Sequence, residues 1–413
     1  MKVADLPEMT FPAGADGCPV RNLVTGQQEA PFVRLESPGL DNSMVLVADT
    51  AKIDQVYKSP DVFVSRRGPQ ARRFDSSYSA EVAEVYAAKG LRLIPLLAWS
   101  DGESHLRYRR LVDTAFHPGK IELKKPYIAE MIEGLIDRFP AGGEVDFMSA
   151  FATQLPAMVM LKELGLDADN VSLLQSTANH AAKMLDFTSA SEEMVAGAHA
   201  VVALQEVLTE RIKSIRETPE NNLLSNLVHA TSSGHEPLSD DELLSMAIEV
   251  LVAGAHSTAA MLGWCVYVLA KRPDLHRRLR DEPEKAPDFV EEVLRRHGAI
   301  VTSYRTAETD TGIDELAIPE GTHVTIRLDC ANMDAERWTN PDTIDIDRPH
   351  INRHYAFGKG KHTCIGNALA RAEMTLSVRA LVRRFDSVSL TTEPEACPSF
   401  DGHFLGELPV VFA

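Results

Sequence analysis

One cysteine of this chain stands in a setting that suits chemistry at sulfur. Cys364 follows Gly358 and Gly360, two glycines that let a backbone turn tightly and approach a flat, bulky group without an intervening Cβ. Apolar residues then recur at intervals of three and four from Ile365 to Leu376, which predicts an amphipathic helix that begins just after the cysteine. Unpaired N–H groups and the positive dipole end at the start of that helix favour a thiolate over a thiol. A buried structural cysteine is the commoner case, but these surroundings favour a sulfur that faces a planar cofactor.

The ten residues from Phe357 to Gly366 read Phe-Gly-x-Gly-x-His-x-Cys-x-Gly. This run resembles the haem-binding loop of the cytochrome P450 family at six fixed positions. The resemblance implies that the cofactor is haem b (iron protoporphyrin IX), that Cys364 is the axial thiolate ligand of its iron, and that Phe357 contacts the cofactor. A zinc site at His362 and Cys364 would need two more ligands at a short spacing, and neither a CxxC nor an HxxxH motif accompanies the pair.

Composition narrows the class of protein. A chain of 413 residues with 44% hydrophobic content can bury a large core. The net charge of −18 argues against nucleic acid as a partner. Five scattered cysteines make a disulfide framework unexpected, and the first 20 residues contain neither a basic segment nor an apolar run. We therefore expect a cytoplasmic protein without a membrane anchor.

The pattern along the chain predicts mostly helices with a few strands. We expect a hairpin from the runs 32–35 and 44–48, a short helix through Tyr57 capped by Asp49-Thr50, and a long irregular stretch over 61–100. Helical patterns follow, and the longest helix is predicted from about Ser239 to Ala270. A second hairpin is predicted at 318–326 and short strands beyond Phe385. The resemblance implies a mainly α, triangular single domain over 1–413, with a smaller β-rich part at about 31–48, 304–328 and 386–413.

Two pairs of residues are candidates for holding the cofactor's carboxylates. His105 and Arg109 lie four apart on a predicted helix and share one face; a solvated basic helix is the alternative. The resemblance implies that these two, with Arg305 and His354, contact the haem propionates, since a buried carboxylate needs partners.

An E-x-x-R pair, Glu292 and Arg295, lies about seventy residues before the cysteine loop. Alone, such a pair usually means a surface ion pair on a helix. The resemblance implies instead a structural ion pair that locks the core beneath the haem.

The middle of the longest predicted helix carries a group of small and polar residues. Gly254 and the hydroxyls that follow suggest a helix bulge with room for a small ligand, and ordinary Ser/Thr back-bonding is the alternative. In the family an acid–alcohol pair that delivers protons stands here; this chain has His256 at the acid position, Ser257 at the alcohol and Thr258 next. Histidine can relay protons near neutral pH, so we expect these three residues to be catalytic.

The resemblance also implies a substrate pocket lined from several separate segments by mainly apolar residues, which suits a hydrophobic ligand. Glu249 is the exception, either a paired core residue or a partner for a polar substrate group. The predicted lining residues are Trp99, Leu185, Phe187, Glu249, Ala253, Val301 and Phe404.

The function implied is monooxygenation: one atom of O2 enters a small hydrophobic organic substrate. No flavin or nicotinamide motif is present, so electrons should come from a ferredoxin or similar redox partner and its reductase. A basic patch of Arg107, Arg110, Lys359 and Lys361 would attract an acidic ferredoxin. The unusual His256–Ser257 pair leaves open a peroxide-driven oxygenase or a nitric oxide reductase, and a non-catalytic haem sensor is a further alternative.

Overall fold

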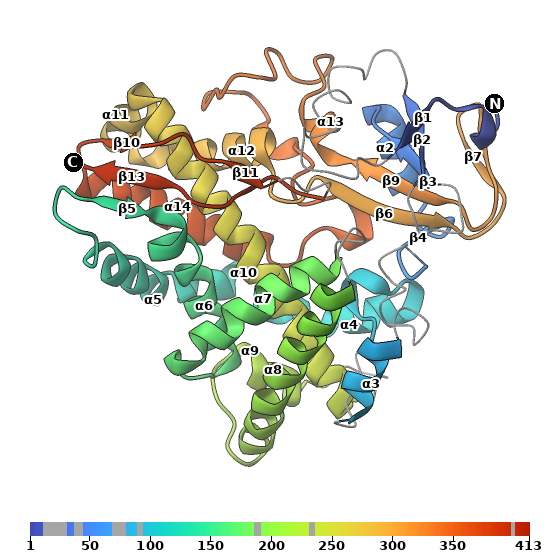
Figure 1. Cartoon of the computed structure of the whole chain (residues 1–413), viewed down its shortest axis with the longest axis horizontal. Coiled ribbons are helices and arrows are strands. Elements are labelled where there is room, and N and C mark those ends of the chain that lie inside the picture. Colours follow the sequence, from blue (N-terminus) through green and yellow to red (C-terminus); the bar gives the residue numbers. More distant parts are fainter. Residues whose placement is uncertain are drawn as a thin grey trace. The chain divides into compact units, whose positions relative to one another are not determined.

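The computed structural model describes residues 1–10, 31–36, 44–67, 80–88, 94–185, 191–230, 236–397 and 401–413. Residue contacts divide the chain into two compact units: Met1–Pro69, Asp281–Cys364 and Pro394–Gly406 form the first, and Gln70–Arg280, Ile365–Glu393 and Glu407–Ala413 form the second. Most strands belong to the first unit and most long helices to the second (Figure 1). The mainly helical class predicted from the sequence is confirmed, and the single domain stays a prediction.

Among the described residues, a sheet of six strands in the order β1-β2-β3-β9-β6-β4 forms the core of the first unit. Its strands are β1 (Glu8–Thr10), β2 (Phe32–Glu36), β3 (Met44–Val47), β4 (Phe63–Val64), β6 (Thr302–Ala307) and β9 (His323–Arg327). The predicted hairpin is confirmed, since β2 and β3 pair antiparallel with Phe32 opposite Val47. β9 runs between β3 and β6, parallel to the former and antiparallel to the latter.

One face of this sheet packs on helix α2 (Thr50–Lys58). Val47 and Ile326 from the central strands join Ile53 and Val56 of the helix in one apolar cluster. The helix begins where predicted because the side chain of Asp49 accepts the N–H of Lys52 at 3.0 Å.

The hairpin predicted around Pro319 is wrong. β8 (Leu316–Ile318) pairs antiparallel with β7 (Thr311–Ile313) and not with β9. Asp314 makes the tight turn between β7 and β8 with a φ of +47°. Both edges of β9 are already paired, so no edge remains for β8.

The remaining elements of the first unit are short, apart from one helix. They are η1 (Val3–Asp5), η6 (Pro283–Lys285), α12 (Ala286–His297), α13 (Leu328–Asn332), η7 (Ile351–Arg353), η8 (Gly360–His362) and the strand pair β11 (Ala396–Cys397) and β12 (Phe404–Leu405).

The second unit is built from helices. They are α3 (Ala80–Ala88), η3 (Leu97–Trp99), α4 (Gly102–Phe116), α5 (Pro118–Ile136), the π-helical turn η4 (Met148–Ala152), α6 (Gln154–Leu164), η5 (Ala168–Asn170), α7 (Val171–Leu185), α8 (Ser191–Glu217), α9 (Leu223–Val228), α10 (Asp240–Lys271), α11 (Pro273–Asp281) and α14 (Asn367–Arg384).

The central helix of this unit is α10, which packs against α6, α7, α8 and α14 (Figure 1, yellow). A capping box starts it: the Ser239 hydroxyl accepts the N–H of Glu242 at 3.3 Å, and the Glu242 carboxylate accepts the N–H of Ser239 at 2.9 Å. Within the described residues it is the one helix long and apolar enough to cross a membrane, but 67% of that window is buried in the protein. Such burial is typical of the core helix of a globular protein.

In the second unit the C-terminal strand β13 (Pro409–Phe412) pairs antiparallel with both β10 (Val388–Leu390) and β5 (Glu144–Asp146). The prediction that the C-terminal strands join the N-terminal hairpin is therefore wrong, and β5 was not predicted. Ring contacts among Phe139, Phe385 and Phe412 at 4.8 to 6.2 Å hold the small sheet against the helices.

Candidate functional site

Cys364 is an exposed thiol at the end of a loop that begins at Tyr355 in the first unit. Gly358 and Gly360 have φ angles of +65° and +72°, in the left-handed region that favours glycine. The loop closes on itself through two backbone bonds, from Gly358 N–H to Tyr355 O at 2.8 Å and from Cys364 N–H to Phe357 O at 2.9 Å. The helix predicted after the cysteine is confirmed as α14, which begins three residues later.

Polar contacts anchor the start of this loop. The Tyr355 hydroxyl donates to the Asp54 carboxylate at 2.6 Å, and Lys359 donates to the same oxygen at 3.2 Å. Burial alone would raise the pKa of Asp54, but the hydrogen bonds from Tyr355 and Lys359 outweigh it and lower that pKa. Arg337 donates to the Tyr355 hydroxyl at 3.1 Å, and Tyr355 N–H donates to the side chain of Asn332 at 2.6 Å. Contacts within the protein therefore hold this loop in place without a cofactor.

Arg305 is a buried cation in strand β6, with 8% of its surface exposed. Its guanidinium donates to the Ser303 hydroxyl at 3.0 Å and to the Tyr304 carbonyl at 2.6 Å, and it stacks over the ring of Tyr57 at 5.5 Å. These contacts hold the guanidinium in place, so Arg305 can bind an anion without a change of its side-chain conformation.

The ring of His354 is engaged at both nitrogens. Ala356 N–H donates to Nδ1 at 3.1 Å, which places the proton on Nε2, 3.0 Å from the Glu291 carboxylate. A contact between His354 and a propionate would therefore require exchange with Glu291. The role predicted for His354 stays a prediction.

The other two candidates for the propionates, His105 and Arg109, belong to α4 in the second unit. His105 is buried, with 2% of its surface exposed, whereas the Arg109 side chain is partly exposed and pairs with Asp113 at 3.0 Å. Their spacing of one turn keeps them on a common face of α4.

The E-x-x-R residues form a fully buried cluster in the first unit. Arg295 donates to both carboxylate oxygens of Glu292 at 2.8 and 2.9 Å, and the side chains of both residues have no exposed surface. Arg348, which the sequence analysis did not identify, donates to Glu292 from the other side at 3.0 Å. The remaining Arg295 protons are accepted by the backbone carbonyls of Asn332 and Thr343 and by the sulfur of Met333. Nothing in the spacing of Arg348 signalled this role, because its partner lies 56 residues away.

The bulge expected at Gly254 is absent, since α10 is α-helical from Asp240 to Lys271. A Cβ at Gly254 would lie 3.2 Å from the sulfur of Met160, so this glycine lets α6 pack closely. The Ser257 hydroxyl donates to the Ala253 carbonyl at 2.8 Å, which is the back-bonding alternative. Burial lowers the pKa of His256, which favours its neutral form.

Accessibility along α10 provides a test of whether this chain fits a haem. Ala253 is exposed although Leu251 and Ala255 beside it are buried, and His256 and Ser257 are partly exposed. Apart from His256, the side chains of this accessible stretch are small, so a large flat group can approach it. In the first unit the exposed Cys364 supplies a soft sulfur donor. The residues present therefore fit a haem–thiolate site.

Two of the predicted pocket residues lie on adjoining segments of the first unit. Val301, which is buried, donates its N–H to the Asp401 carbonyl at 2.8 Å. A Cβ at Gly402 would lie 2.3 Å from the Ala299 carbonyl and 2.4 Å from the Phe404 ring, so only glycine fits there. The segments that carry Val301 and Phe404 are thus in direct contact.

The other predicted pocket residues belong to the second unit. Trp99 ends η3, Glu249 and Ala253 lie on α10, and Leu185 is the last residue of α7. Phe187 lies outside the described residues. The carboxylate of Glu249 accepts the N–H of Ala98 at 2.8 Å, so the expectation that it is a paired residue has direct support.

Three of the four cations proposed to attract a redox partner are paired with carboxylates. Lys359 pairs with Asp54 at 3.2 Å, Lys361 with Asp61 at 3.1 Å, and Arg107 with Glu242 at 2.7 Å. These carboxylates offset much of the positive charge. Arg110 is exposed on α4.

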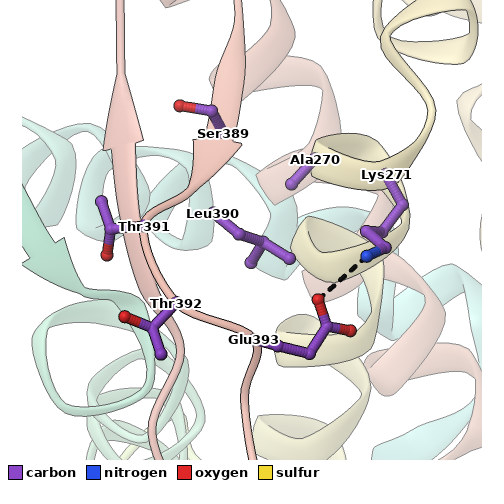
Figure 2. Close-up of a pocket in the computed structure, with 7 residues that line it drawn as sticks. All are labelled: Ala270, Lys271, Ser389, Leu390, Thr391, Thr392 and Glu393. Atoms are coloured by element: carbon purple, nitrogen blue, oxygen red, sulfur yellow. Dashed lines mark hydrogen bonds and ion pairs between the residues drawn. The ribbon is translucent and has the colours of Figure 1, made fainter.

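A pocket of about 360 Å³ lies in the second unit where α10 ends beside β10. Figure 2 shows the Lys271–Glu393 ion pair, 2.9 Å long, beside Leu390 and the hydroxyls of Ser389, Thr391 and Thr392. The Tyr267 hydroxyl also donates to Glu393 at 2.8 Å. None of the predicted site residues lines this pocket, and its exposed polar lining suggests no chemistry.

This chain is similar to known proteins in sequence and in structure. A family model described as Cytochrome P450 matches residues 75–407. Cytochrome P450 107B1 of Saccharopolyspora erythraea is 34% identical over 302 residues, covering 73% of this chain and 72% of that protein. Nocardicin C N-oxygenase of Nocardia uniformis is 34% identical over 318 residues, covering 76% of this chain and 78% of that protein.

Solved structures show the same fold. P450BioI, crystallised with an acyl carrier protein bearing hexadec-9Z-enoic acid, matches with a TM-score of 0.85 and 26% identity over 96% of this chain and 98% of its own. The Bacillus subtilis polyketide-synthase cytochrome P450 PksS matches with a TM-score of 0.85 and 26% identity over 98% of this chain and 100% of its own.

Proposed function

This chain belongs to the cytochrome P450 family, and we propose that Cys364 is the residue through which it holds haem b as an axial thiolate. Membership makes the chain a haem-dependent monooxygenase with the mainly α fold of that family. The single observation that carries the assignment of Cys364 is its exposure at the end of a loop turned by two left-handed glycines.

Bound haem with a thiolate ligand supplies cleavage of the O–O bond, so that one oxygen atom enters an organic substrate. The residues of the chain hold the cofactor and manage protons. Arg305 is proposed as a propionate partner because its guanidinium is buried and fixed, and His105 because it is a buried polar side chain on α4. Arg109 would have to bind a propionate while it is still paired with Asp113. His354 would have to replace its hydrogen bond to Glu291 with one to the propionate.

His256 is proposed as the proton carrier of the site. Its lowered pKa keeps the imidazole neutral near pH 7, and a neutral imidazole can accept a proton at one nitrogen and release one at the other. The Ser257 hydroxyl donates its proton to Ala253 O, which leaves its oxygen free to accept a hydrogen bond. Thr258 is buried, with 4% of its surface exposed, and is the weaker candidate for contact with a substrate.

The proposed substrate is a small hydrophobic organic molecule. Each of the following residues is proposed to contact that substrate: Trp99, Leu185, Phe187, Glu249, Ala253, Val301 and Phe404. The names of the relatives indicate different substrates, and nocardicin C is one of them. Membership of the family therefore supports a class of substrate and not one particular compound.

Electrons are proposed to come from a ferredoxin and its reductase, and the protein is proposed to be cytoplasmic. No nucleic acid or membrane is expected as a partner, in keeping with the net charge of −18.

Isotope labelling tests the activity. A hydrophobic compound that shifts the haem spectrum is incubated with the protein, ¹⁸O₂, a ferredoxin, its reductase and a reductant. We expect a product that contains one ¹⁸O atom and requires the reductase. Product formed from peroxide alone, with no dependence on the reductase, would indicate the peroxide-driven alternative. Binding of the compound with no product under either condition would indicate a sensor.

A further inference from the structure

One face of α10 carries three hydrogen-bond acceptors at the spacing i, i+3 and i+7: Glu242, Ser245 and Glu249. At about 100° per residue these side chains lie within roughly 60° of one another around the helix. Each of them accepts hydrogen bonds from the part of the chain between Ile94 and Tyr108. The face therefore fastens one continuous stretch of chain to the central helix.

Two of these contacts go to backbone N–H groups of an irregular segment. Ser245 Oγ accepts the N–H of Ile94 at 2.9 Å, and Glu249 Oε1 accepts the N–H of Ala98 at 2.8 Å. The donors are four residues apart and so are the acceptors, so the segment follows the helix for about one turn. Leu96 and Leu97 between the two donors are buried.

Local geometry explains why an acceptor is needed at Ala98. It is the second residue of η3, and the first N–H groups of a helix have no partner within it. The N-cap residue, Leu96, offers no side-chain oxygen. Glu249 from another helix supplies the missing acceptor.

The third contact fixes the helix that follows. Glu242 accepts two hydrogen bonds from Arg107, at 2.7 and 3.1 Å, and one from the Tyr108 hydroxyl at 2.8 Å. Burial alone would raise the pKa of Glu242. Hydrogen bonds from Arg107, from the backbone N–H of Ser239 and from Tyr108 outweigh burial and lower this pKa to about 2. The ion pair between Glu242 and Arg107 therefore holds α4 against α10. The hydrogen bonds to Ser245 and Glu249 hold the segment that precedes α4.

The same helix face continues into the proposed site. Ala253 lies four residues beyond Glu249 and His256 lies seven beyond it, and both are accessible. The segment held by Glu249 ends at Trp99, a proposed pocket residue. One turn of α10, about 6 Å, thus separates the fastening point from the accessible stretch.

We propose that Ser245 and Glu249 are positioning residues that determine substrate specificity, by fixing the 94–99 segment as a wall beside the accessible stretch of α10. This inference rests on the proposed function, because the segment is a substrate wall only if that stretch faces the haem. Glu249 then shapes the pocket indirectly, because its carboxylate holds the backbone at Ala98.

The variants separate hydrogen bonding from charge. Glu249→Gln keeps a carbonyl oxygen that can accept from Ala98, whereas Glu249→Leu removes the acceptor at similar volume, and Ser245→Ala removes the other. Glu210→Gln is the matched control, because Glu210 is an exposed carboxylate on α8 in the same unit. All are studied as holoproteins.

Hydrogen exchange of the backbone is the first measurement. In Glu249→Leu the Ala98 amide should exchange roughly tenfold faster or more, because losing a hydrogen bond to a charged acceptor costs at least that factor. Glu249→Gln should restore most of the protection, Ser245→Ala should affect Ile94 more than Ala98, and Glu210→Gln should change neither. Unchanged exchange at Ala98 in Glu249→Leu overturns the proposal.

Binding of n-alkylimidazoles of increasing chain length, followed by the haem spectrum, is the second measurement. Wild type should discriminate among chain lengths, and Glu249→Leu should lower that discrimination roughly fivefold or more while Glu249→Gln keeps it. Faster exchange at Ala98 with an unchanged chain-length profile would show a purely structural contact and would also overturn the proposal. Failure of the proposed function has a different signature: wild-type protein would then show no thiolate spectrum, whatever the exchange at Ala98.

Discussion

Glu373 is a buried acid on α14 with 2% of its surface exposed, and its Oε2 atom has no hydrogen-bond partner. Burial raises the pKa of Glu373 from 4.5 to about 8. The nearby Tyr127 hydroxyl donates to Glu163 at 2.6 Å, and Lys124 pairs with the same carboxylate. Glu373 is thus a neutral carboxylic acid at pH 7, beside a separate charged pair.

This buried acid makes stability depend on pH. Between pH 4.5 and 8 the folded state binds the Glu373 proton and the unfolded state releases it, so its stabilising contribution is complete below about pH 4.5 and is lost as pH rises through 8. Glu373→Gln should remove this loss. We expect the free energy of unfolding of the variant, relative to wild type, to rise by about 2–4 kcal/mol from pH 5 to pH 9. Denaturant titrations across that range measure it, and a constant difference would show that Glu373 titrates normally.

His256 should govern how many electrons end in product. If it carries protons, His256→Ala should lower product formed per electron by roughly tenfold or more and divert electrons to peroxide. The double change Ser257→Ala and Thr258→Ala should do the same while ligand binding survives. His199→Ala, which alters an exposed histidine of α8, is the control. Full coupling in both variants would show that His256 only packs in the core.

At the scale of elements, the Glu292–Arg295–Arg348 cluster joins α12 to the segment before the cysteine loop. Arg348→Ala removes one of two cations from a fully buried carboxylate, which should cost about 2–4 kcal/mol of unfolding free energy. Arg296→Ala breaks a partly exposed pair with Asp342 and should cost less than about 1 kcal/mol. Equal effects of the two substitutions in denaturation experiments would contradict this account of the cluster.

Local signals at the starts of two helices led to correct predictions. The cap residue Asp49 and the capping box of Ser239 and Glu242 set the starts of α2 and α10 near the predicted residues. Strand partners were less predictable, because alternation in β8 shows a strand but not that its partner is β7. The strand β5 was not predicted, because two of its three residues, Glu144 and Asp146, are acidic, and acidic residues are uncommon in strands.

At the scale of the whole molecule, the net charge of −18 would repel an acidic electron donor, so local positive charge has to attract it. Since carboxylates pair with Arg107, Lys359 and Lys361, Arg110 should carry much of any attraction to an acidic ferredoxin. Arg110→Glu should slow reduction roughly three- to tenfold at low salt and little at high salt. Lys213→Glu on α8 is the control. Stopped-flow reduction at several ionic strengths measures this, and an unchanged rate would place the donor elsewhere.

The candidate site was only partly predictable for the same physical reason as the strands. The loop before α14 is one short run, so the tight turn at Gly358 and Gly360 and the helix after Cys364 were predicted from the sequence. Contacts between distant segments gave no signal, and so Arg348 and the pairing of Ala98 with Glu249 appeared only in the structure. The close packing of Gly254 against Met160, about ninety residues earlier, likewise appeared only in the structure.

The measurement that tests the central claim most directly is the absorption spectrum of the reduced protein under carbon monoxide. If Cys364 is the thiolate ligand, wild type and the control Cys265→Ala should absorb far to the red of a histidine-ligated haem. Cys364→Ser should lose that band while keeping its fold by circular dichroism. A histidine-type spectrum from intact wild-type protein, or an unchanged band in Cys364→Ser, would contradict the account.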